Sequence, residues 1–290
     1  DGSQNEKYYL LFTTGTLEGR TFDVTANSAN SITVTPDDDG DIATLIGSAT
    51  DNFEIRPHWT LNTVFPDGEN FATSSDPFDP IGLLLLRTIT SDGINIAPTQ
   101  AYIYFDSSNN TEDGWYDPNN LASGKKNDVV LKTNTFFTFR NESTTTNILN
   151  LVGDVPLTDA VTYVKENVIK QDSFIAMQFP VDVSLIDSGL LGSQSFTVST
   201  DPFSVDGDQL LVYSDVINGY NPAPIAAYFY YDSSTNSEDG WYDVNNLSEG
   251  KKDGLKLFKP GKGFIIRKGG SVSESLIQLK SNIPYNPFAE

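Results

Sequence analysis

Two long stretches of the sequence are nearly identical. Residues 101–126 read AYIYFDSSNNTEDGWYDPNNLASGKK, and residues 227–252 read AYFYYDSSTNSEDGWYDVNNLSEGKK. The similarity continues upstream, where FATSSDPF at 71–78 matches FTVSTDPF at 196–203. A match of this length and quality indicates a tandem duplication.

The repeat distance sets the expected size of the folding unit. Equivalent residues lie 125 to 127 positions apart, from residues 71 and 196 to Arg140 and Arg267. That spacing is too long for a solenoid repeat and is about the size of one small domain. Between the copies, residues 141–147 (NESTTTN) form a polar stretch of the kind that separates domains. We therefore expect two similar domains, 1–140 and 141–290.

Short apolar runs separated by turn residues predict the fold class. Runs such as Tyr8–Thr13 alternate with Gly, Asn, Asp and Pro, and hardly any window has a helical period. Two runs, Thr21–Thr25 and Ser31–Thr35, are joined by NSAN and predict a hairpin. Residues 59–65 (WTLNTVF) also have the composition of a strand. The sequence predicts an all-β protein with a β-sandwich or a partly open, barrel-like domain in each half, and the pattern does not distinguish these two.

The charge balance restricts the partners. The chain has 39 Asp and Glu residues against 18 Lys and Arg residues, a net charge of −21. This charge repels nucleic acid and anionic membrane surfaces. No apolar run approaches the roughly 20 residues that cross a bilayer, and Ile81–Leu86 is only strand-length. We expect neither nucleic-acid binding nor membrane insertion.

Cysteine is absent, and His58 is the single histidine. Without thiols the chain has neither a disulfide framework nor a thiolate metal site. It begins at Asp1 rather than Met, which suggests a mature form from which a signal peptide has been removed. Many secreted bacterial proteins share these features, so the expected location is extracellular or at the cell surface.

Five segments carry a resemblance to a known family. They are YYL at 8–10, VTANSANSITV at 24–34, FEIRPHWTLNTVFP at 53–66, QDSFIAMQFPVDVSL at 171–185 and PGKGFIIRK at 260–268. Together they resemble an uncharacterised family of secreted proteins found mainly in Verrucomicrobia-type bacteria. The resemblance implies export and an all-β build, but no activity, cofactor or catalytic residue. Family members open with a further β-rich stretch and have a shorter hairpin before the repeated Trp, which leaves open whether the first domain has its opening strands.

The repeated loop before each Trp has the spacing of a cation-binding loop. Oxygen-bearing side chains fall at alternate positions and a carboxylate follows at the twelfth, as in loops that wrap a hard cation with six to eight oxygens. The candidate ligands are Asp106, Ser108, Asn110, Glu112 and Asp117 in the first copy, and Asp232, Ser234, Asn236, Glu238 and Asp243 in the second. Calcium is the expected ion. The alternative is a solvated hairpin tip, because Asp, Ser and Asn are also good turn formers.

The aromatic pairs Trp115–Tyr116 and Trp241–Tyr242 directly follow these loops. A Trp-Tyr pair on a β scaffold can form a stacking platform for sugar rings, and two copies would bind an extracellular polysaccharide bivalently. In the competing interpretation each Trp is a core residue that covers its own hairpin.

The motifs for catalysis are weak. Most carboxylates sit in Gly/Asn turns rather than singly at strand ends, and no G-x-S-x-G elbow accompanies His58. We therefore expect a protein that is not an enzyme. The main hypothesis is an extracellular structural protein that self-assembles into a surface layer, matrix or filament, with Tyr8–Phe12 and residues 281–290 docking on neighbouring copies. The alternatives are a carbohydrate-binding attachment module and a monomer whose termini fold onto its own sheets.

Overall fold

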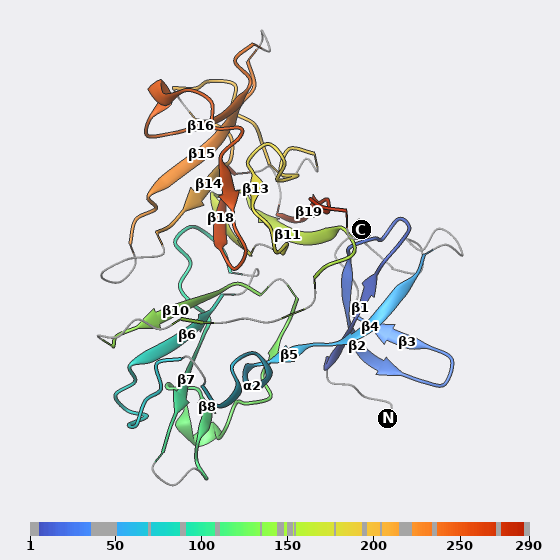
Figure 1. Cartoon of the computed structure of the whole chain (residues 1–290), viewed down its shortest axis with the longest axis vertical. Coiled ribbons are helices and arrows are strands. Elements are labelled where there is room, and N and C mark those ends of the chain that lie inside the picture. Colours follow the sequence, from blue (N-terminus) through green and yellow to red (C-terminus); the bar gives the residue numbers. More distant parts are fainter. Residues whose placement is uncertain are drawn as a thin grey trace. The chain divides into compact units, whose positions relative to one another are not determined.

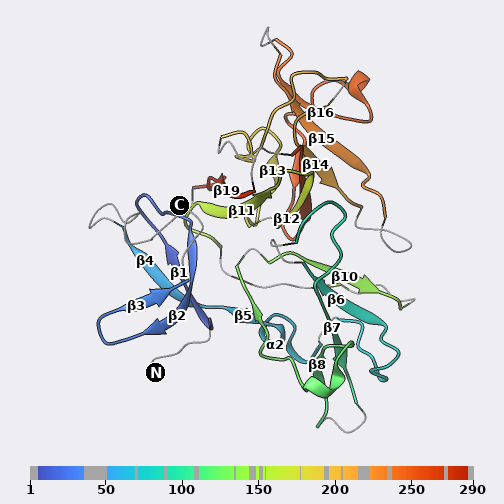
Figure 2. The same ribbon diagram turned by 180° about the vertical axis from the view of Figure 1, so that it is seen from behind.

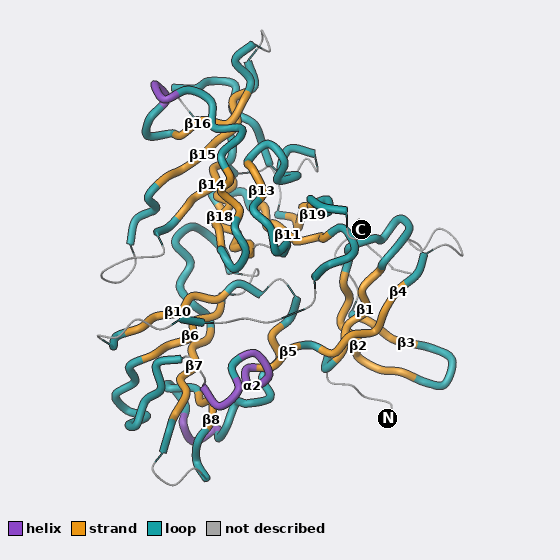
Figure 3. The backbone as a smooth tube through the Cα atoms, viewed as in Figure 1, coloured by secondary structure: helices purple, strands orange, loops and turns teal. Residues whose placement is uncertain are grey.

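Strands dominate both parts of the chain, as the tube in Figure 3 shows. The computed structural model describes residues 6–35, 51–68, 71–87, 91–107, 111–133, 135–143, 148–149, 153, 155–176, 178–192, 196–203, 205–214, 222–233, 237–270 and 274–286. These residues confirm the all-β class. None of the helices they form is long and apolar enough to cross a membrane.

The chain divides into two compact units. The first comprises Asp1–Phe12, Thr21–Thr88 and Ala97–Asp154, and the second comprises Thr13–Arg20, Ile89–Ile96 and Val155–Glu290. The division predicted from the sequence differs in two respects. The last segment of the first unit continues beyond the polar stretch at 141–147, and two short segments from the first half of the chain pack with the second unit.

The first unit contains two antiparallel four-stranded sheets (Figure 1). One has the order β3-β2-β1-β4, from β1 (Tyr8–Phe12), β2 (Thr21–Asn27), β3 (Ile32–Val34) and β4 (Phe53–Pro57). The other has the order β10-β6-β7-β8, from β6 (Gly82–Leu86), β7 (Gln100–Phe105), β8 (Gly114–Tyr116) and β10 (Phe137–Asn141). The strands β5 (Trp59–Thr60) and β9 (Val130–Leu131) form a separate pair. The predicted hairpin is the β2–β3 pair, which is confirmed.

The second unit contains a five-stranded sheet of order β12-β18-β14-β15-β16, which is seen from behind in Figure 2. Its strands are β12 (Gln171–Ala176), β14 (Gln209–Val212), β15 (Ala226–Tyr231), β16 (Gly240–Asp243) and β18 (Gly263–Lys268). Two further pairs are β11 (Ala160–Glu166) with β19 (Ser275–Ser281), and β13 (Val183–Ser184) with β17 (Lys256–Phe258).

The repeated sequences form the same local structure in each unit. The order β10-β6-β7-β8 corresponds to β18-β14-β15-β16, and β5-β9 corresponds to β13-β17. The isolated bridge between Ser74 and Phe105 recurs between Ser199 and Tyr231. The units differ at one edge: β12 adds a strand beside β18, whereas no strand among the described residues lies on the corresponding side of β10.

Residues 59–65 do not form the continuous strand that their composition predicts. The strand β5 stops at Thr60, and α2 (Leu61–Val64) begins there with a capping box. The Thr60 N–H donates to the Thr63 hydroxyl at 2.6 Å, and the Thr63 N–H donates to the Thr60 hydroxyl at 3.3 Å. In a continuous strand these backbone N–H groups would bond to a neighbouring strand. Here the two Thr hydroxyls accept their hydrogen bonds, which allows a helix to begin at Leu61. The turn buries Leu61 and Phe65 in the core.

A partly buried polar cluster ties the first sheet of unit 1 to the segment after β9. The His58 side chain contacts the Asp23 carboxylate through Nε2 at 2.8 Å, and Lys132 donates to the other Asp23 oxygen at 2.6 Å. Burial raises the pKa of Asp23, but the hydrogen bonds from His58 and Lys132 outweigh it, and the net effect lowers the pKa. His58 is therefore a packed structural residue beside the ring of Tyr9, whose centroid lies 4.7 Å away.

Candidate functional site

Each repeated loop is bridged by an aspartate that is not among the predicted calcium ligands. In the first copy the Asp113 carboxylate accepts hydrogen bonds from the Ser107 N–H at 2.6 Å and from the Ser107 hydroxyl at 2.8 Å. In the second copy Asp239 accepts from the Ser233 N–H at 2.7 Å. The signal was the invariant Glu-Asp-Gly-Trp in both copies, because a carboxylate six residues after a turn serine can bridge the loop.

A tyrosine and a lysine hold the other side of each loop. The Tyr116 hydroxyl donates to the Glu112 carbonyl at 2.8 Å, and Lys125 Nζ donates to the Thr111 carbonyl at 2.9 Å. In the second copy the same bonds are made by Tyr242 to Glu238 at 2.8 Å and by Lys251 to Ser237 at 3.0 Å. The repeated Lys residues thus bind their own loops.

The predicted calcium ligands are only partly described. Ser108, Asn110, Ser234 and Asn236 lie outside the described residues. Asp117 accepts from the Asn119 N–H at 2.8 Å and Asp243 from the Asn245 N–H at 2.9 Å, so both carboxylates cap the turn that follows the Trp-Tyr strand. No three or more His, Asp or Glu side chains within the described ranges lie close enough together to hold a metal ion. Calcium binding at these loops stays a prediction.

The electrostatic environment of the loops is negative. Burial raises the pKa of Tyr104, and the nearby carboxylates Asp67, Asp113 and Asp106 raise it further. Burial also raises the pKa of Tyr116, with Glu112 and Asp113 adding to the effect. Both shifts disfavour a negative phenolate, first because the rings are buried and second because carboxylates lie nearby.

The two tryptophans are fully buried, so they do not form the sugar-stacking platform considered as the alternative. Trp115 and Trp241 each have 0% of their surface exposed. The ring centroid of Trp115 lies 4.9 Å from Phe71 and that of Trp241 lies 5.0 Å from Phe196. Tyr116 and Tyr242 are half-buried and bonded to their own loops. A ring inside the core cannot stack on a polysaccharide, and the core-residue interpretation applies.

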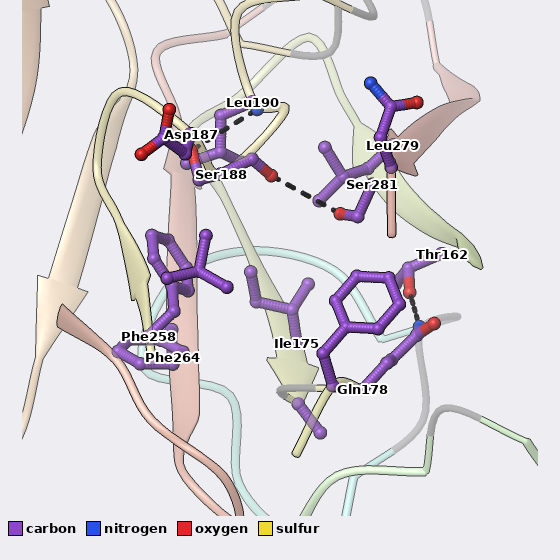
Figure 4. A pocket seen from close by; sticks show the side chains of 14 residues that line it. Thr162, Ile175, Gln178, Asp187, Ser188, Leu190, Phe258, Phe264, Leu279 and Ser281 are labelled. Carbon is purple, nitrogen blue, oxygen red and sulfur yellow. Dashed lines mark hydrogen bonds between the residues drawn. The ribbon is translucent and has the colours of Figure 1, made fainter. Parts of the chain in front are cut away.

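The second unit contains a small cavity of about 40 Å³. Figure 4 shows Ile175, Phe258 and Phe264 on one side and the polar groups of Ser188 and Ser281 on the other. The Ser281 hydroxyl donates to the Ser188 carbonyl at 3.4 Å. A space of this size holds a few water molecules at most and is far below the roughly 300–1,000 Å³ of a ligand pocket.

The first unit has a larger apolar hollow of about 730 Å³ on one face of its first sheet. It is lined by alternate residues of the four strands and by the β2–β3 turn, namely Tyr8, Leu10, Phe12, Val24, Ile32, Val34, Phe53, Ile55 and residues 27–31. Three of these side chains are well exposed: Tyr8 at 39%, Phe53 at 48% and Ile55 at 53%. None of the lining residues is charged.

The chain matches no known protein family, no curated protein and no solved structure. Its resemblance to the secreted bacterial family therefore stays a prediction.

The two tryptophans provide a matched test of the core. Trp115 Nε1 donates to the Phe65 carbonyl at 3.4 Å, whereas the buried Trp241 Nε1 has no partner among the described residues. Replacing either by Phe removes the larger ring, but only Trp115→Phe also removes a hydrogen bond, worth about 1 kcal/mol. We expect Trp115→Phe to lower the free energy of unfolding of its unit more than Trp241→Phe does, as measured by urea unfolding. An equal or larger loss in Trp241→Phe would contradict this assignment.

The calcium prediction is tested by thermal unfolding of the full chain in millimolar calcium and in excess chelator. A bound ion stabilises the folded state by mass action, by about 2.7 kcal/mol at one hundred times its Kd. We expect a higher midpoint with calcium, and a smaller rise when Asp106 and Asp232 are both replaced by Asn. Coincident curves would show that the loops are hydrogen-bonded hairpin tips.

Proposed function

We propose that this chain is a non-enzymatic extracellular structural protein whose copies associate through the β4 edge of the first sheet. The observation that supports the proposal best is the exposure of Phe53 and Ile55 on β4, which is an edge strand among the residues that the structure describes. An edge strand presents backbone N–H and C=O groups that can pair with another chain, and exposed apolar side chains beside it favour that contact. The occupant of the edge is a second copy of this chain.

The register of the sheet places the apolar side chains on one face. Across the β1–β4 pair, Leu10 lies opposite Ile55 and Phe12 lies opposite Phe53. Side chains two residues apart point to the same face of a strand, so Tyr8 joins Leu10 and Phe12 there. The hollow is thus continuous with the exposed edge, and a neighbour that paired with β4 would also cover apolar surface.

Charge favours this surface over others. The net charge of −21 opposes packing of copies at acidic surfaces. The hollow has no charged lining residue, and the charged residues of β4 point to its other face, where Arg56 Nε donates to Glu54 at 2.8 Å. Burial of β4 therefore removes apolar area from water without removing an unpaired charge.

Two docking segments expected from the sequence are occupied within the chain itself. Residues Tyr8–Phe12 form β1, which pairs with β2 on one side and β4 on the other, so this strand has no free edge. Near the C-terminus, the Ile283 N–H donates to Asp159 at 3.0 Å and the Tyr285 hydroxyl donates to the Pro156 carbonyl at 2.8 Å. Residues 287–290 lie outside the described residues. We therefore place the proposed contact between copies at β4 and not at these two segments.

The extracellular location belongs to the proposal and rests on the resemblance to secreted proteins. Assembly into a layer, matrix or filament would follow if each copy used β4 against a different surface of the next copy, because such contacts do not close. If β4 paired with β4 of a neighbour, the contact would be two-fold and would stop at a dimer. The mass of the particles distinguishes these arrangements.

The proposal predicts that one charge at the β4 edge abolishes association. In Ile55→Lys the new ammonium would be buried in an apolar contact, which is costly without a partner. The matched control is Ile225→Lys, because Ile225 is also exposed, at 64%, but lies in the second unit. Light scattering at increasing concentration should show particles larger than one chain for the wild type and for Ile225→Lys, and monomers for Ile55→Lys. A wild type that stays monomeric at the highest concentration, or an Ile55→Lys chain that associates normally, would overturn the proposal.

A further inference from the structure

Three ionisable side chains meet at one end of the core of the second unit. Lys268 is the last residue of β18 and follows Phe264 and Ile266, which are both buried in that core. Successive side chains of a strand alternate between faces, so Lys268 points to the same side as these two apolar residues. A lysine at a core-facing position is unusual, because burying an ammonium is expensive unless it is paired.

The carboxylates of Asp208 and Glu166 are directed toward the same core by β14 and β11. Asp208 directly precedes β14 and lies two residues before the fully buried Leu210. Glu166 ends β11, two residues after the fully buried Val164. Leu210 and Val164 belong to the same core cluster as Ile266. The alternation of each strand therefore directs all three groups toward one point.

The geometry brings the amine against the Asp208 carboxyl group. Lys268 Nζ lies 2.5 Å from Asp208 Oδ2 and 3.0 Å from Glu166 Oε1. The exposed fraction of the side chain is 3% for Lys268, 1% for Asp208 and 16% for Glu166. With a C–O bond of about 1.2 Å, Nζ lies at most about 3.7 Å from the carboxyl carbon, close to the about 3–3.5 Å of a reacting pair.

Backbone donors fix the carboxyl group in place. The Gly269 N–H donates to Asp208 Oδ1 at 2.9 Å, and the Thr197 N–H donates to Oδ2 at 2.7 Å. A preorganised N–H aimed at one carboxyl oxygen stabilises the negative charge that develops there when a nucleophile adds to the carbon. Asp208 is thus both held and polarised.

The ion pairs that Lys165 makes in the same unit lack that combination. Lys165 Nζ lies 2.5 Å from Asp92 and 2.8 Å from Glu274, but the side chains of these carboxylates are 57% and 62% exposed. In the first repeat, Asn141 occupies the strand position that corresponds to Lys268. It pairs with Gly82, the first residue of β6. The fold of the repeat therefore does not require an amine and a carboxylate at this place.

We propose that Lys268 and Asp208 condense to an intramolecular isopeptide bond, with Glu166 transferring the proton. In the first step a proton passes from the ammonium to Asp208 Oδ2, which gives a neutral carboxylic acid and a neutral amine that can act as a nucleophile. Nζ then adds to the Asp208 carbon, and the charge develops on Oδ1 beside the Gly269 N–H. Glu166 takes a proton from Nζ and delivers it to Oδ2.

The C–Oδ2 bond then breaks, and Oδ2 leaves as water. One N–C bond forms and one C–O bond breaks. The ammonium loses two of its three hydrogens to the departing water, one in the first proton transfer and one through Glu166, and the amide nitrogen keeps the third. No oxidant, reductant or further reactant is needed. The product is an amide between residues 60 positions apart, which would lock the start of β14 to the end of β18. This inference is independent of the proposed association at β4, because the bond would form within a single chain and inside its second unit.

Mass spectrometry of the purified, folded full chain tests the bond. The wild type should be lighter than its sequence by one water, about 18 Da, and a protease digest should contain one branched peptide that joins Asp208 and Lys268. Glu166→Gln keeps the amine and the carboxyl group but removes the proton carrier, and it should restore the full mass. Lys165→Arg is the matched control, because Lys165 is also buried but pairs with the exposed carboxylates of Asp92 and Glu274, and this variant should keep the loss of water.

Location of the mass change makes the result decisive. Asp-Gly sequences such as Asp113–Gly114 and Asp253–Gly254 can also lose water, by closing a succinimide on their own backbone. A wild-type chain with the full sequence mass would overturn the proposal, and so would a lost water that maps to an Asp-Gly site without a branched peptide. Retention of the branched peptide in Glu166→Gln would overturn the role of Glu166.

Discussion

The burial of one tryptophan in each repeat is the constraint on which both units depend. Each indole removes a large apolar surface from water and packs against aromatic rings of neighbouring segments. The segment after the Trp folds back over it: the Lys126 N–H donates to the Trp115 carbonyl at 2.7 Å, and Asn127 accepts from the Trp115 N–H at 2.9 Å. Lys252 and Asp253 do the same for Trp241, at 2.7 Å in both bonds. The repeated sequence therefore forms the same contacts around the Trp in both halves.

The sequence allowed much of the fold to be predicted, because the repeat and the short alternating runs report local structure directly. The helix at Leu61–Val64 was missed because Leu61 and Phe65 lie four residues apart, a spacing that a short apolar run shares with a strand, and the Thr60–Thr63 cap decides the outcome. The candidate site was less predictable. Whether Trp115 faces the core or solvent depends on which residues cover it, and the covering rings of Phe65 and Phe71 lie far from it in sequence.

The differences between the repeats carry more functional information than their similarities. In the second unit β12 pairs with β18 over six residues, and the Asp172 N–H on that strand donates to the Gly93 carbonyl at 2.9 Å. In the first unit, β5 is the counterpart of β13, and the strand before it is β4. That strand belongs to a different sheet, β3-β2-β1-β4, and lies at its edge. One copy of the repeat thus has a covered sheet edge and a buried Lys-Asp pair, and the other has an exposed apolar edge. The proposed association and the proposed covalent bond each use a feature that the other repeat lacks.

Hydrogen exchange of the full chain at low and high concentration tests the central claim, that copies meet at β4, most directly. Association through this edge predicts that backbone amides within residues 53–56 exchange more slowly at high concentration, and Pro57 has no amide hydrogen to report. Amides of the central strand β1 and of the second unit should exchange at the same rate at both concentrations. Exchange that is independent of concentration throughout the chain, or slowing that is confined to the second unit, would contradict the account.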